Sequence, residues 1–129
     1  MKRVEYFDAG QWPIHIGFTT SEKAFKRELK RLQCEDTNFL NSDHASATTH
    51  FLDGSEGSFC AIICLGSCDN YDMSQVAALL AHEATHVAQR LWRRIGEHEP
   101  GDEAEAYIVQ FITQQCLNEL DGFRDKFKK

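Results

Sequence analysis

The sequence predicts an α+β fold in a single domain that spans residues 1–129. Short β-favouring runs occupy much of the first half of the chain, and two long helical patterns occupy the second half. Strands first and long helices last are typical of α+β domains. The length is that of one domain, and a content of 42% apolar and 26% charged residues is ordinary for a globular protein.

The N-terminal part of the chain predicts short strands and one helix. Residues 2–8 and 12–19 contain β-favouring runs, which we expect to form two short strands or one strand and an extended arm. Ser21 is a favourable N-cap for a helix over about 22–33. One face of this helix is basic, and the apolar face carries Phe25, Leu29 and Leu32.

A β-hairpin is predicted in the middle of the chain. Two extended runs, 48–52 and 58–65, stand on either side of a Gly-containing loop at 53–57. The second run is apolar on both faces, so we expect a strand that is covered on both sides.

Two long helices are predicted after the hairpin. Asp72 is a good N-cap with Gln75 three residues later, and the helix that follows should run to about Ile95. Its broad apolar stripe makes it the expected centre of the fold, with the small sheet packed on it. A second helix is expected over about 100–120. Asp-Gly at 121–122 then interrupts the helical pattern.

Charge and composition limit the classes of function. The chain has 20 acidic and 14 basic residues, whereas general nucleic-acid binding requires a net basic face, so we expect none. Basic clusters at 23–31 and 90–94 are expected to be solvated helix faces. No apolar run reaches the roughly 18–20 residues of a membrane span, and none follows the charged N-terminus as in a signal peptide. Five cysteines, an odd number, favour free thiols in a reducing, cytoplasmic setting.

One motif carries chemistry: residues 82–86 read His-Glu-Ala-Thr-His within the first long helix. His82 and His86 lie one turn and about 40° apart around the axis, so both imidazoles can bind one ion. Glu83 is rotated about 100° from His82, which makes it a poor ligand but leaves it close enough to reach a water at the metal. The pattern predicts zinc at His82 and His86, with Glu83 as the general base.

Such a site suits hydrolysis. Zinc lowers the pKa of a coordinated water and polarises a carbonyl oxygen. Glu83 can then accept the proton of the water and pass it to a leaving amine. Catalytic zinc sites keep one position open, so a third protein ligand is expected and not a fourth. Chance alone produces this motif at roughly the per-cent level, but its place in an amphipathic helix that precedes a carboxylate-rich helix favours a functional site.

The motif followed by a glutamate on the next helix resembles the gluzincin branch of the zincin metallopeptidases. The resemblance implies a zincin-like fold. It also implies that the third metal ligand is the glutamate that begins a segment of the form E-x-x-A, which Glu103 and Ala106 match. Glu105 is the competing ligand, and the two glutamates point about 200° apart on a helix, so both cannot face the metal. Polar residues four and seven positions after Glu103, Tyr107 and Gln110, favour Glu103.

Further candidates remain near the motif. Tyr107 is a candidate catalytic residue, because its hydroxyl could bind a ligand or the oxyanion of the reaction. Gln89 and Arg93 extend the stripe of His82 and His86 and are candidates for substrate contacts. Other histidines that could supply the third ligand are His44, His50 and His98.

The chain is similar to small phage and bacterial zincins, in which the substrate lies along an edge strand near the metal helix. That resemblance implies a zinc metallopeptidase acting on a protein or peptide substrate, with residues 48–65 as the substrate region, in the cytoplasm of a bacterium or a phage-infected cell. Two alternatives stay open. One is a zincin-fold interaction module that binds zinc with little turnover, and the other is a helix-rich binding protein without metal.

Overall fold

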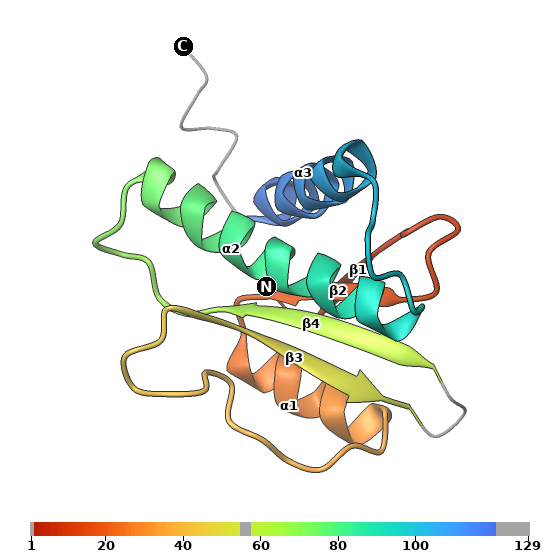
Figure 1. Cartoon of the computed structure of the whole chain (residues 1–129). Helices are drawn as coiled ribbons and strands as arrows, with labels where there is room; N and C mark the ends of the chain where they lie inside the picture. The colour runs from red at the N-terminus through yellow and green to blue at the C-terminus, as the bar shows by residue number, and fades with distance from the viewer. Residues whose placement is uncertain (1, 55–57, 121–129) are drawn as a thin grey trace. The chain divides into compact units, whose positions relative to one another are not determined.

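The computed structural model describes residues 2–54 and 58–120 (Figure 1). The chain divides into two compact units, residues 1–69 and residues 70–129. The first unit contains every strand and one helix of the described chain, and the second contains two helices. The predicted α+β class is therefore confirmed, since the described residues form one mixed sheet of four strands and three helices.

The first unit is a four-stranded sheet with a helix against one face (Figure 1). Its strands are β1 (Glu5–Phe7), β2 (His15–Thr19), β3 (Ala47–Asp53) and β4 (Phe59–Leu65), in the order β1-β2-β4-β3. The β1–β2 and β3–β4 pairs are antiparallel, whereas β2 and β4 are parallel. The helix is α1 (Glu22–Arg31). The order leaves β3 at one edge of the sheet.

The predicted hairpin and its buried strand are confirmed. β3 and β4 pair from Ala47↔Leu65 to Asp53↔Phe59, while residues 55–57 of the predicted loop lie outside the described part of the chain. All seven residues of β4 are buried. Alternate side chains of β4 enter the core beneath α1, because successive residues of a strand point to opposite faces. This core contains Val4, Phe25, Leu29, Phe39, Cys60, Ile62 and Cys64.

Helix α1 begins as predicted and ends earlier than predicted. The Ser21 side chain accepts a hydrogen bond from the Ala24 amide at 3.1 Å, which caps the helix. The helix stops at Arg31, short of the predicted 33, because Gln33 adopts a left-handed backbone with φ of 58°. A non-glycine residue in that region ends helical geometry.

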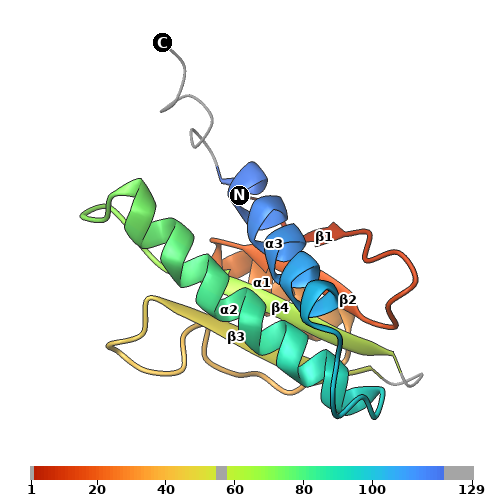
Figure 2. The same cartoon turned by 45° about the horizontal axis from the view of Figure 1, so that its top comes forward.

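The described part of the second unit contains α2 (Met73–Arg94) and α3 (Asp102–Glu119), which runs back beside α2 (Figure 2). Both lie within the predicted ranges, and the predicted interruption at 121–122 is outside the described residues. An open groove of about 900 Å³ runs along the pair and includes Ala81 and Thr85 of α2. Within the described chain, no helix is both long and apolar enough to cross a membrane.

Candidate metal centre

The metal motif lies in the middle of α2, whose ends are fixed by local hydrogen bonds. The Asp72 side chain accepts from the Gln75 amide at 2.9 Å, and the Gln75 side chain accepts from the Asp72 amide at 2.8 Å. This is the predicted capping box. At the other end Ile95 is the C-cap, and Gly96 takes the left-handed conformation, with φ of 76°. Residues 82–86 are therefore held in regular helical spacing, more than a turn from either end.

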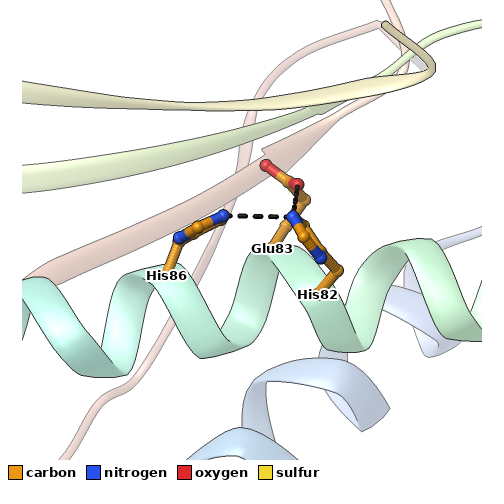
Figure 3. A group of neighbouring side chains, drawn as sticks. All are labelled: His82, Glu83 and His86. Atoms are coloured by element: carbon orange, nitrogen blue, oxygen red, sulfur yellow. Dashed lines mark hydrogen bonds and ion pairs between the residues drawn. The ribbon is translucent and has the colours of Figure 1, made fainter.

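The two imidazoles converge on one point beside the helix (Figure 3). The Nε2 atoms of His82 and His86 are 3.1 Å apart, and the ring planes are nearly perpendicular, at 82°. The nearer carboxylate oxygen of Glu83 lies 4.0 Å from Nε2 of His82. These three residues form the one group in the described chain whose ligand atoms lie close enough together to hold a metal ion.

The distances fit a zinc ion bound by the two histidines. At Zn–N distances of about 2.0–2.1 Å, tetrahedral geometry separates two ligand nitrogens by about 3.3 Å. The observed 3.1 Å differs from that value by an amount that small rotations of the rings can supply. The nearer Glu83 oxygen, at 4.0 Å from Nε2 of His82, is farther from that atom than Nε2 of His86 is. The predicted division into two ligands and a general base stays a prediction, because all three side chains belong to the group that could hold an ion.

Burial also separates the three side chains. The side chain of His82 is 68% exposed and that of Glu83 is 9% exposed, and His86 is exposed as well. An ion held by the imidazoles would therefore be open to solvent and to a substrate. The carboxylate stands in a less hydrated position, where its electrostatic interactions are stronger than in water.

The glutamates predicted as third ligand lie on α3 and are not members of this group. Glu105 lines the groove with Ala81 and Thr85, which are rotated about 100° around α2 from the imidazoles. In Figure 3 the three side chains project from one side of α2, and α3 passes on the other side. Glu103 is exposed in the first turn of α3 and Tyr107 is 63% exposed. Their roles as ligand and catalytic residue stay predictions.

The other histidines are not brought into the group. His50 donates from Nε2 to the carbonyl oxygen of Phe39 at 2.8 Å, and its ring lies 4.6 Å from the Phe25 ring. These contacts give His50 a structural role in the first unit. His44 and His98 are exposed.

The first unit also contains a polar cluster that was not predicted from the sequence. Glu28 accepts hydrogen bonds from two nitrogens of Arg31, at 2.7 and 2.6 Å, and from the hydroxyl of Tyr6. The hydrogen bonds from Arg31 lower the pKa of Glu28, and burial is the main cause that raises the pKa of Tyr6. The i,i+3 spacing of Glu28 and Arg31 could have revealed their pairing, but the partnership with Tyr6 depends on the β1–α1 arrangement.

Comparisons with protein-family models, with curated proteins and with solved structures find no match to this chain. The likeness to gluzincins consequently rests on the motif at residues 82–86 and on the order of elements around it.

Proposed function

We propose that the chain is a zinc-dependent peptidase of the gluzincin type, with zinc held by His82 and His86 and with Glu83 as the general base. The observation that carries the proposal is the convergence of the two Nε2 atoms to 3.1 Å beside a carboxylate at 4.0 Å. Zinc, when bound, acidifies a coordinated water and polarises a carbonyl oxygen.

The side chains of the motif have separate roles in this proposal. His82 and His86 bind through Nε2, the atoms that already face each other. Glu83 accepts a proton from the attacking water and returns it to the leaving amine. An amide needs that returned proton, because an amine leaves as a neutral group. A carboxylate within reach of both the water and the departing nitrogen serves both transfers.

The third ligand is proposed to be Glu103, with Glu105 as the competitor. On a helix the two point about 200° apart, so one substitution at a time separates them. We expect Glu103→Gln to weaken zinc binding at least about tenfold and Glu105→Gln to leave it within about twofold. The affinity is measured by competition with a chromogenic chelator, and the reverse pattern would transfer the role to Glu105.

The test of the proposed activity is Glu83→Gln, because glutamine keeps the shape of the side chain and removes the base. The variant should keep stoichiometric zinc and lose at least about 100-fold in hydrolysis of any peptide the wild type cleaves. Glu99→Gln, at an exposed loop position outside the metal group, is the matched control and should leave turnover unchanged. Zinc binding without cleavage by the wild type would favour the alternative of a zinc-binding interaction module. Absence of zinc binding would overturn the proposal.

A further inference from the structure

The face of α2 that carries the imidazoles continues toward the C-terminal end of the helix. Arg93 follows His86 by seven positions and His82 by eleven, which places it within about 20° of both around the helix axis. Arg90 follows His86 by four positions, about 40° away. Both arginines are exposed, as are His82 and His86. The two candidate metal ligands and two arginines therefore share one solvent-facing stripe of α2.

Beyond the metal motif, the charged residues of α2 are all arginines. Glu83 is the nearest acidic residue of α2, and it is buried. Among the described residues no ion pair of the Arg93 side chain is found. A guanidinium that faces solvent on the same helix face as a metal site is suited to bind a carboxylate of an incoming molecule, in a bidentate geometry.

The helix end accounts for only part of this pattern. Cations in the last turn stabilise a helix through its dipole, and Arg93 and Arg94 both occupy the last turn of α2. That effect does not depend on the angle around the axis. Arg94 is about 80° from His86, whereas Arg93 is aligned with the imidazoles. The two residues therefore separate the helix-end effect from an effect of position on the stripe.

We propose that Arg93, assisted by Arg90, selects peptide substrates with an acidic side chain three or four residues from the bond that is cleaved. The proposal rests on the proposed function, since it requires a peptide whose carbonyl lies at the metal site. The specificity residues are distinct from the catalytic group and act on substrate binding.

The spacing follows from the rise of a helix and of an extended peptide. The imidazoles bracket position 84, and Arg90 and Arg93 lie about 9 and about 14 Å farther along the axis. An extended peptide that runs along α2 advances about 3.3 Å per residue. Its third and fourth residues from the metal then stand over Arg90 and Arg93.

The test measures binding rather than turnover, so that it does not depend on Glu83. The zinc-loaded full chain is titrated with short peptide hydroxamates, which attach to zinc through the hydroxamate group at one end of the peptide. Two series carry the hydroxamate at the C-terminal or the N-terminal end, and glutamate replaces glutamine at the second to the sixth residue in turn. In one series glutamate at the third or fourth residue should tighten binding about 3–10-fold over glutamine.

Substitutions assign the preference to the stripe. Arg93→Ala should remove most of the preference for glutamate, and Arg93→Glu should reverse it in favour of lysine at the same residue. Arg94→Ala should preserve the preference. Equal binding of glutamate and glutamine peptides at every residue would overturn this inference. So would a loss of the glutamate preference in Arg94→Ala as large as that in Arg93→Ala. Neither result would contradict the proposed zinc site. If no hydroxamate binds in the presence of zinc, the proposed function falls and this inference with it.

Discussion

Zinc should stabilise the folded chain, and His82→Ala should remove that stabilisation. The ligand pair exists only while α2 is helical, because the 3.1 Å approach of the two Nε2 atoms depends on their spacing of one helical turn. Unfolding separates the imidazoles and lowers the affinity for the ion. Any ligand that binds the folded state alone raises the free energy of unfolding by mass action.

The expected size follows from the chain length. Free zinc at 100 times its dissociation constant adds about 2.7 kcal/mol to the free energy of unfolding. With an unfolding entropy of about 2.1 cal/mol/K per residue, cooperative unfolding of the 129-residue chain converts this to a rise in Tm of about 10 °C. Loss of a direct ligand should weaken binding at least about 100-fold, so that the same zinc concentration raises the Tm of His82→Ala by no more than about 2 °C.

The assay is differential scanning calorimetry of metal-free protein with and without buffered zinc. His98→Ala is the matched control, because His98 is an exposed histidine outside the metal group. It should show the full shift of the wild type. The His82 side chain faces solvent on a helix, so metal-free His82→Ala should unfold near the wild-type temperature. A zinc-induced rise in Tm above about 5 °C in His82→Ala would refute the assignment of the ligands. The same conclusion would follow if His98→Ala lost as much of the zinc-induced rise as His82→Ala.

Three further predictions concern stability and thiol chemistry. Ser21→Ala should lower the free energy of unfolding by about 1 kcal/mol in urea titrations, whereas Ser21→Asn, which can also cap, should lower it less. Because its interactions depress the pKa of Glu28, the folded state gains stability above the unfolded pKa of about 4.3 and loses it as the pH falls. Between about pH 5 and pH 3, the free energy of unfolding of the wild type should therefore fall relative to that of Glu28→Gln. If the two proteins show parallel curves of unfolding free energy against pH, Glu28 does not cause the loss of stability. In a disulfide-exchange assay of the native chain at neutral pH, the half-buried thiols of Cys34 and Cys68 should react first, and the three buried thiols should react only on unfolding.

Local patterns explain what the sequence could predict about this fold. The ends of α2 follow from the Asp72 capping box and from Gly96, which act within a few residues. The approach of His82 and His86 follows from the fixed geometry of one helical turn. The hairpin was predictable because its two extended runs lie close together in the sequence, on either side of a Gly-containing loop.

The features that escaped prediction depend on contacts between distant segments. The parallel pairing of His15 with Cys60 has no local signature, because residues far apart in sequence set the register. The interaction of Tyr6 with Glu28 likewise requires β1 and α1 to be in place. The position of α3 beside α2 decides where Glu105 points, and helical periodicity could narrow the choice between the two glutamates but not settle it.

The position of β4 has a consequence for how this protein must be handled. Its seven residues, Phe-Cys-Ala-Ile-Ile-Cys-Leu, carry no charge and no proline, a composition that promotes intermolecular cross-β assembly when a segment is exposed. Protection of β4 requires β2, its parallel partner from far earlier in the chain, and such long-range pairing forms slowly. Refolding at high concentration should consequently favour aggregation, and rapid dilution should favour the native chain.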